Sequence, residues 1–281
     1  MDFFVDFSNQ PQKVGSYYTL KSEVQLISKL LNETRNTVYC IPGSNERQNN
    51  YFSLIMLDDV NPVNVVFVEV TQSVLRDKYP ENILNELNDQ NYFSTARLRY
   101  LYKTFKIHPA LNWGVQTNLA ADLFASKLNK KFFTFHITEP YESQNSKEYF
   151  DSWVTFLIKL RGITNFPFIF VGPLKILKDI TSIRDVYFLD ALGFSLQQQA
   201  CIISQSSAFM GTASGMCAPA TLSKIPYIIF KHPKYHEVEM SKELYESRLP
   251  WATKNQSFKL VPISGKILNS FIQDLVIHET T

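Results

Sequence analysis

The sequence predicts an α/β protein made of two Rossmann-like halves, and three observations carry this prediction. Apolar runs of strand length alternate with amphipathic helical segments. Some of these runs, such as 166–171, are continuously apolar, as is typical of strands buried on both faces of a parallel sheet. The chain has 281 residues, enough for two domains that each bury a core.

The second half shows the alternation most clearly. An aromatic strand is expected at 131–137, followed by a helix over 146–160 that ends at Gly162, where a C-cap glycine belongs. Ser195 stands at the N-cap position of an expected helix over 195–204. The other expected elements are strands at 166–171, 186–189, 208–211 and 225–230 and helices at 174–183 and 214–224.

The first half repeats the pattern with weaker periodicity. The expected elements are strands at 1–7, 37–41 and 64–70, a helix at 20–31, short helices between 71 and 111, and a helix at 113–128. We therefore expect an N-terminal Rossmann-like domain over residues 1–129 and a C-terminal one over residues 130–281.

Composition and charge exclude several classes of protein. The 28 Lys and Arg residues nearly balance the 26 Asp and Glu residues, which gives no reason to expect a nucleic-acid partner. The apolar runs are too short to predict a transmembrane helix, and the first residues lack the basic start of a signal peptide. Cys40, Cys201 and Cys217 form no C-x-x-C pair, so we expect neither disulfides nor a zinc site, and a reducing cytoplasm fits.

Glycine is scarce, with 9 residues in 281, so two glycines in one turn stand out. The turn Gly-Thr-Ala-Ser-Gly lies between an expected strand and an expected helix, where free backbone N–H groups and the helix dipole favour an anion. Small residues that only let the helix pack closely on the strand are the alternative. Neither the P-loop nor the G-x-G-x-x-G spacing is present. The residues expected to hold a diphosphate are Gly211, Thr212, Ser214, Gly215, Met216 and Cys217.

The segment 209–230 resembles the C-terminal domain of GT-B fold glycosyltransferases, in particular fucosyltransferase-like and heptosyltransferase-like enzymes. Phe-Met-Gly-Thr-Ala-Ser-Gly is similar to the loop with which those enzymes hold the diphosphate of a sugar nucleotide. Phe133 to Ile137 resembles their strand ending in His-Ile/Val-Arg, but Thr138 replaces the arginine, so that donor contact is not carried over. The resemblance covers about 130–235 and implies a cleft between a donor domain and a reduced acceptor domain.

Four further residues are expected at the carboxyl edge of the second sheet, where ligands bind in open α/β folds. Lys175 and Lys231 would neutralise a diphosphate as point charges, although each also fits an ordinary surface lysine. His136 would contact the donor or the leaving group, with a satisfied core histidine as the alternative. Asp190 follows a short strand and completes the set of donor-binding candidates.

The first half is expected to supply the general base that inversion at a sugar carbon requires. Asp6, Glu46 and Glu69 are the candidates because they lie at or just after expected strand ends, and their spacing does not choose among them. A D-x-D motif is missing, and Asp58-Asp59 reads as a turn, so a metal-dependent transferase is disfavoured and no metal or other cofactor is expected.

These observations predict a metal-independent glycosyltransferase that moves a sugar from a nucleotide-sugar donor to a glycan or lipid-linked acceptor. The expected setting is bacterial polysaccharide biosynthesis in the cytoplasm, with weak peripheral contact to the inner membrane face. Two alternatives stay open: a nucleotide-sugar epimerase or hydrolase on the same fold, and a non-catalytic module that binds a nucleotide or a glycan. The donor sugar, the acceptor and the stereochemical outcome do not follow from the sequence.

Overall fold

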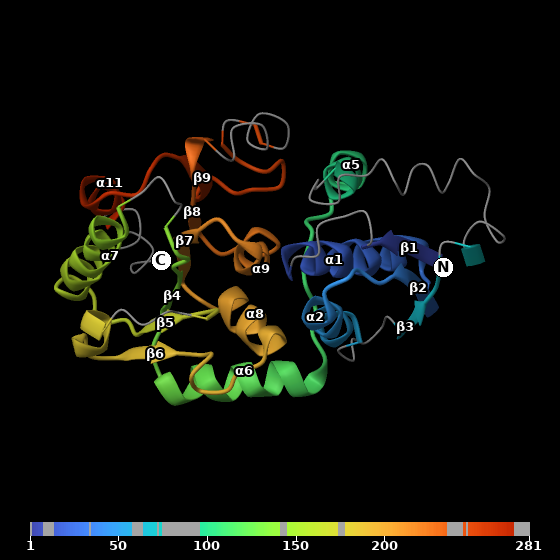
Figure 1. Ribbon diagram of the computed structural model, residues 1–281, viewed down its shortest axis with the longest axis horizontal. Coiled ribbons are helices and arrows are strands. Elements are labelled where there is room, and N and C mark those ends of the chain that lie inside the picture. Colours follow the sequence, from blue (N-terminus) through green and yellow to red (C-terminus); the bar gives the residue numbers. More distant parts are fainter. Residues whose placement is uncertain are drawn as a thin grey trace. The chain divides into compact units, whose positions relative to one another are not determined.

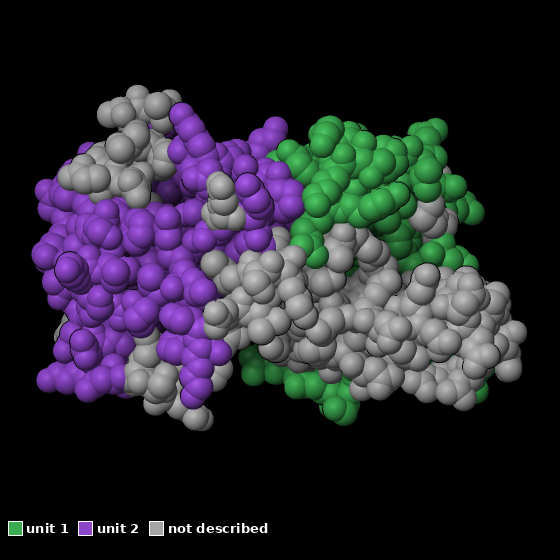
Figure 2. Space-filling model, turned by 90° about the horizontal axis from the view of Figure 1, so that it is seen from above, with its two compact units in different colours: residues 1–118 green, residues 119–281 purple. Residues whose placement is uncertain are grey.

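The computed structural model forms two compact units, residues 1–118 and 119–281 (Figures 1 and 2). It describes residues 2–7, 14–33, 35–57, 64–71, 73–74, 96–140, 145–173, 178–234, 244–245 and 247–272. Each unit contains its own parallel β-sheet with helices, which confirms the predicted α/β class. The division between the units falls inside α6 (Val115–Leu128).

The first unit is built on a three-stranded parallel sheet with the order β1-β2-β3. Its strands are β1 (Asp2–Asp6), β2 (Arg35–Ile41) and β3 (Asn64–Glu69). Its helices are α1 (Val14–Leu31), α2 (Glu46–Leu57) and α5 (Ala96–Phe105). The sequence pattern missed α2, whose polar residues mask its helical periodicity, and placed the start of α1 too late.

An aromatic cluster holds α1 and α2 to the end of β1. The rings of Phe7, Tyr17 and Phe52 contact one another edge to face, with centroids 5.0 to 5.3 Å apart. Nearby, the buried Lys21 donates from Nζ to the carbonyl of Ile55 at 2.6 Å. The charged side chain of α1 is therefore buried with a backbone acceptor from α2.

The second unit contains a six-stranded parallel sheet with the order β6-β5-β4-β7-β8-β9. Its strands are β4 (Phe133–His136), β5 (Phe168–Phe170), β6 (Val186–Phe188), β7 (Ala208–Thr212), β8 (Tyr227–Lys231) and β9 (Gln256–Leu260). The chain builds outward from β4 in one direction, returns to pair β7 with the other side of β4, and then builds outward again. The strand order thus reverses between β4 and β7.

Helices cover both faces of this sheet (Figure 1). On one face lie α7 (Ser146–Arg161) and α11 (Gly265–Ser270), and on the other lie α8 (Leu196–Ser204) and α9 (Ala218–Thr221). The core on the α7 face contains Phe133 and Phe135 of β4. Because side chains alternate along a strand, His136 points to the opposite face, towards α9.

The caps of two predicted helices agree with the sequence. Ser195 forms a full capping box with Gln198 at the start of α8, and Gly162 is the C-cap of α7. The helix expected over 214–224 is shorter and divided, with a 3-10 turn, η2 (Gly215–Cys217), followed by the four-residue α9. The hydroxyl of Ser223 bonds to the carbonyl of Ala220 at 2.8 Å, just after α9 ends.

Candidate functional site

The candidate site lies where the strand order of the second unit reverses. In open α/β sheets, ligands bind at this switch point, outside the carboxyl ends of the strands. The segments that follow the two central strands run in opposite directions there and leave a crevice between them. Here the switch point separates β4 from β7, whose ends pair His136 with Gly211. The segments that follow carry Thr138 on one side and the turn with Ser214 on the other.

A hydrogen bond between side chains joins these two strand ends. Nε2 of His136 lies 2.6 Å from Oγ of Ser214, while Nδ1 lies 2.8 Å from the carbonyl oxygen of Val171. The imidazole is 4% exposed, and Ser214 is exposed at the surface of the turn. Burial lowers the pKa of His136, and the bond to Val171 opposes that shift only in part.

Two glycines make room for His136. Gly172 has φ +76°, and a Cβ atom there would lie 2.8 Å from Cε1 and 2.9 Å from Nδ1 of the imidazole. At Gly211 a Cβ atom would lie 2.6 Å from the carbonyl oxygen of His136. Both distances are too short for real carbon contacts, so only glycine fits at these positions. Gly211 therefore has a packing role beside His136, as in the alternative weighed for small residues at this turn.

Most donors of the turn after β7 already have partners inside it. The N–H of Met216 donates to Oγ of Ser214 at 3.1 Å, and the N–H of Cys217 donates to the carbonyl of Ser214 at 3.1 Å. The thiol of Cys217 donates to the carbonyl of Thr212 at 3.1 Å, and burial raises its pKa to about 12. An anion at the turn would therefore rely on the N–H groups of Ser214 and Gly215 and on the Ser214 hydroxyl.

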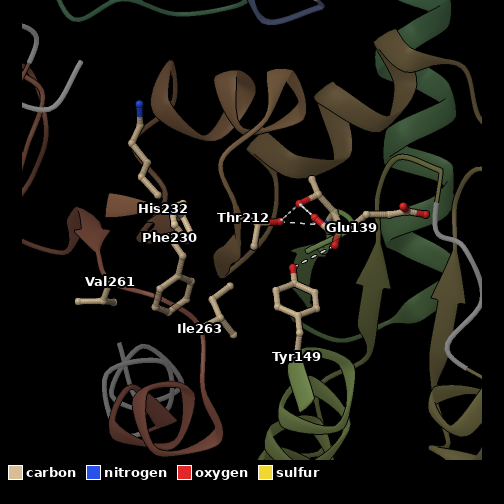
Figure 3. Close-up of a pocket in the computed structure, with 9 residues that line it drawn as sticks. Glu139, Tyr149, Thr212, Phe230, His232, Val261 and Ile263 are labelled. Carbon is tan, nitrogen blue, oxygen red and sulfur yellow. Dashed lines mark hydrogen bonds between the residues drawn. The ribbon is translucent and has the colours of Figure 1, made fainter. Parts of the chain in front are cut away.

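A shallow pocket opens on the α7 side of the same sheet edge (Figure 3). Thr138 bonds to Thr212 through its N–H and through its hydroxyl, each at 2.8 Å. The hydroxyl of Tyr149, which rises from α7, donates to the carbonyl of Thr138 at 3.0 Å. The pocket is lined by Thr138, Glu139, Tyr149, Thr212, Phe230, Lys231, His232, Val261 and Ile263.

The structure brings most of the expected donor-binding residues to one place. Those gathered at the ends of β4 and β7 are His136, Gly211, Thr212, Ser214, Gly215, Met216 and Cys217. Lys231 ends the neighbouring strand β8 and lines the pocket. Asp190 is exposed after β6, at the far side of the sheet, and is not near the turn. Lys175 lies outside the described residues. The ligand contacts assigned to this set stay predictions.

The three candidate bases lie in the first unit. Asp6 ends β1 and pairs with Ile41, while Glu69 ends β3 and pairs with Cys40. Both residues are thus at the carboxyl edge of that sheet, on either side of β2. Glu46 is exposed at the start of α2, and Glu69 is also exposed. The side chain of Asp6 lies outside what the structure describes, and the choice of base stays open.

Sequence reasoning missed several residues that shape the site. The sequence pattern places Gly172 directly after an expected strand, at the same edge of the sheet, and Tyr149 within an expected helix, but it assigns no contact to either. The buried amide of Gln199 was not singled out, although its Oε1 accepts from the N–H of Gly172 at 2.8 Å and so holds that glycine in place. A solitary glycine directly after a buried strand, in a chain with few glycines, was the available signal for Gly172.

No group of three or more His, Cys, Asp or Glu side chains among the described residues is placed to hold a metal ion. Within the same residues, no helix combines the length and the apolar character needed to cross a membrane.

Comparison with solved structures identifies the fold. A glycosyl transferase family 9 protein from Veillonella parvula superposes with a TM-score of 0.58 at 10% identity, covering 98% of this chain and 97% of that one. The Escherichia coli ADP-heptose lipopolysaccharide heptosyltransferase II gives 0.57 at 12% identity, covering all of both chains. E. coli heptosyltransferase WaaC with ADP gives 0.56 at 10% identity, covering 98% of this chain and 100% of that one.

The chain therefore has the GT-B architecture of two Rossmann-like domains, as the resemblance predicted. Identities of this size establish the fold alone. No family model matches the sequence, and no curated protein matches it.

Proposed function

We propose that this protein is a metal-independent glycosyltransferase that transfers a sugar from a nucleotide-sugar donor to a glycan or lipid-linked acceptor. The observation that carries the proposal is the turn of small and hydroxyl residues at the switch point of the second sheet, between β4 and β7. This is where an open α/β sheet offers backbone donors to a phosphate group.

The second unit would bind the donor. The N–H groups of Ser214 and Gly215 and the Ser214 hydroxyl would donate to the diphosphate, with Lys231 contributing positive charge from the next strand. The structures of WaaC contain ADP in one case and ADP-2-deoxy-2-fluoro heptose in another. ADP-linked sugars are therefore the first donors to test.

Catalysis would come from stabilising the charge that builds on the departing diphosphate, because fixed donors at that position cost no reorganisation during the reaction. The first unit would present the acceptor and the base, with Asp6, Glu46 and Glu69 as candidates. A cytoplasmic bacterial setting, with weak peripheral contact at the inner membrane face, would give the enzyme access to a lipid-linked acceptor.

Thermal unfolding of the wild type and of two variants in the presence of ADP, GDP, UDP and CMP tests donor binding. The three proteins are then assayed for activity with the matching sugar nucleotides. We expect one nucleotide to raise the melting temperature of the wild type and of Ser207→Leu, a control at the amino end of β7. Gly215→Leu should remove the stabilisation while leaving the far-UV circular dichroism unchanged, because its side chain would occupy the space of the diphosphate.

Three outcomes separate the proposal from its alternatives. Sugar transfer that requires an acceptor supports a transferase. Free sugar or an epimerised nucleotide, formed without an acceptor, identifies a hydrolase or epimerase instead. Stabilisation by none of the four nucleotides contradicts a nucleotide-dependent enzyme of either kind.

A further inference from the structure

We propose that Ser214 and His136 form a hydrogen-bond relay that couples the binding of an oxyanion at the turn after β7 to the uptake of a proton by the imidazole. The inference deepens the proposed function and depends on it, because the oxyanion is the diphosphate of the donor or product. It rests on the hydrogen bonds of His136 and on the two glycines that enclose it.

The bonding of His136 determines which ring nitrogen carries the proton. A carbonyl oxygen can only accept, so Nδ1, 2.8 Å from the oxygen of Val171, must be the N–H donor. In the neutral ring Nε2 then has a lone pair and no proton. The 2.6 Å contact between Nε2 and Oγ must therefore be a bond donated by the hydroxyl of Ser214.

This arrangement leaves the Ser214 hydroxyl unable to serve an anion. Its single proton points to His136, and its oxygen accepts from the N–H of Met216 at 3.1 Å. An oxyanion that approaches the exposed Ser214 would meet an oxygen lone pair, which is repulsive. With this bonding the site favours a neutral imidazole and disfavours an anion.

Protonation of His136 reverses the direction of the bond. With a proton on Nε2, the imidazolium donates to Oγ of Ser214, and the hydroxyl proton becomes free to donate to the oxyanion. The positive charge of the imidazolium then lies behind the Ser214 hydroxyl, which separates it from the anion. The bond from Nδ1 to Val171 stabilises this charge. At a pH between the pKa values of His136 in the free and bound protein, up to one proton enters from solvent for each anion bound. This proton forms the Nε2–H bond, and no bond between heavier atoms forms or breaks.

Other titratable groups around His136 do not account for such coupling. On η2, the thiol of Cys217 is neutral because burial raises its pKa to about 12. On the opposite face of the sheet, Tyr149 of α7 is also neutral, since burial raises its pKa. The charge of Lys231, at the end of β8, lowers the pKa of Cys217. The pKa of His136 is shifted by burial and by the hydrogen bond with Val171.

The two glycines leave the space that His136 needs. Side chains at Gly172 or Gly211 would displace the ring or the backbone of His136, as the distances of 2.8 and 2.6 Å require. The hydrogen bonds of Nδ1 with Val171 and of Nε2 with Ser214 hold the imidazole behind the hydroxyl. His136 acts through Ser214, so it is a positioning residue for the anion site.

Titration of the protein with ADP and with pyrophosphate tests the relay. Long-range ¹H–¹⁵N NMR of the five histidines, assigned with His136→Gln, gives the tautomer and the pKa of His136 with and without each ligand. Calorimetry between pH 6.5 and 8, in buffers of different ionisation enthalpy, counts the protons taken up per ligand. The proteins are wild type, Ser214→Ala, Ser214→Thr and the control Ser207→Ala.

For the wild type we expect the Nδ1–H tautomer, a rise of at least one pKa unit at His136 on ligand binding, and affinity that weakens as pH rises. Ser207→Ala should behave in the same way, and Ser214→Thr should retain the coupling because it keeps a hydroxyl. Ser214→Ala should bind more weakly and lose the excess proton uptake. Protons that the ligand itself gains or loses contribute to the measurement in all four proteins. Differences in proton uptake between the proteins therefore report on His136.

The other outcomes overturn the relay in distinguishable ways. Equal proton uptake in Ser214→Ala would mean that His136 meets the anion directly. Binding of ADP without any change at His136 would remove the relay and leave the proposed donor site intact. Failure of the wild type to bind pyrophosphate and all four nucleoside phosphates would remove the donor site and the relay together.

Discussion

The imidazole of His136 and the hydroxyl of Ser214 lie 2.6 Å apart, and their bond links the end of β4 to the turn after β7. His136 ends β4, and Ser214 lies in the turn after the adjacent strand β7, at the point where the order of the sheet reverses. The bond therefore fixes the position of the turn relative to the strand beside it, at the edge where ligands bind in this class of fold.

Replacing Gly172 by alanine should destabilise the protein more than the same change at Gly193. Both glycines have left-handed backbones, with φ of +76° and +78°, so both variants incur the strain of that conformation, about 1 kcal/mol. Only at Gly172 would the new Cβ atom also meet His136, and we expect a total loss of about 2–4 kcal/mol there. Urea unfolding of the two variants measures the difference, and equal losses would contradict the contact with His136.

The free energy of unfolding should fall as the pH drops below about 6.5, partly because of His136. Burial lowers the pKa of this imidazole in the folded protein, so the unfolded chain binds a proton first as the solution becomes acidic. The stability that this adds is present above the unfolded pKa and is lost below it, by at most about 1.4 kcal/mol per pH unit.

His136→Gln should therefore flatten the dependence of unfolding free energy on pH between about 7.5 and 5.5. Urea unfolding at several pH values in this range measures the slope for both proteins. A mutant slope that equals the wild-type slope would show that His136 titrates alike in the folded and unfolded chains.

None of the three thiols should react readily in the folded protein. Cys40, Cys201 and Cys217 are all buried, and the pKa of Cys217 is raised to about 12, so little thiolate is available near neutral pH. Ellman's reagent should label few thiols at pH 8 and all three after denaturation. Rapid labelling of the native protein would mean that these parts of the core open easily.

Removal of the cap at Ser195 should destabilise α8. Ser195 accepts from the N–H of Gln198, whose side chain in turn accepts from the N–H of Ser195. Ser195→Ala should therefore cost about 1 kcal/mol, while Ser195→Asp, which keeps an acceptor, should cost little. Thermal unfolding of both variants provides the comparison, and similar losses would indicate that the cap contributes nothing.

The alternation of strands and helices predicted the second unit well because its strands are apolar throughout. Strands such as β5 and β7 were visible as buried runs, and the cap at Ser195 followed from local chemistry. The strand β9 was not predicted because its residues alternate between polar and apolar, as at the edge of a sheet. Helix length after β7 was overestimated because the residues there also suit the 3-10 turn and the short helix that form in place of one continuous helix.

The position of the candidate site also followed from the sequence, but its internal bonding did not. A turn of small residues after a strand pointed to Ser214 and Gly215, and the strand before it pointed to His136. The partner of Nδ1 is a backbone carbonyl, that of Val171, and a carbonyl leaves no trace in a sequence. The roles of Gly172 and Gly211 depend on distances across strands, which only the folded chain reveals.

The ring of His136 lies directly against Gly172, and its two nitrogens are bonded to Val171 and Ser214. Truncation to His136→Ala would leave a void beside Gly172 and the Ser214 hydroxyl, with the carbonyl of Val171 at its far end. Free imidazole has the size and the hydrogen-bonding groups to fill that void. The protein is thus suited to chemical complementation, in which a small molecule added to the solution replaces a missing side chain.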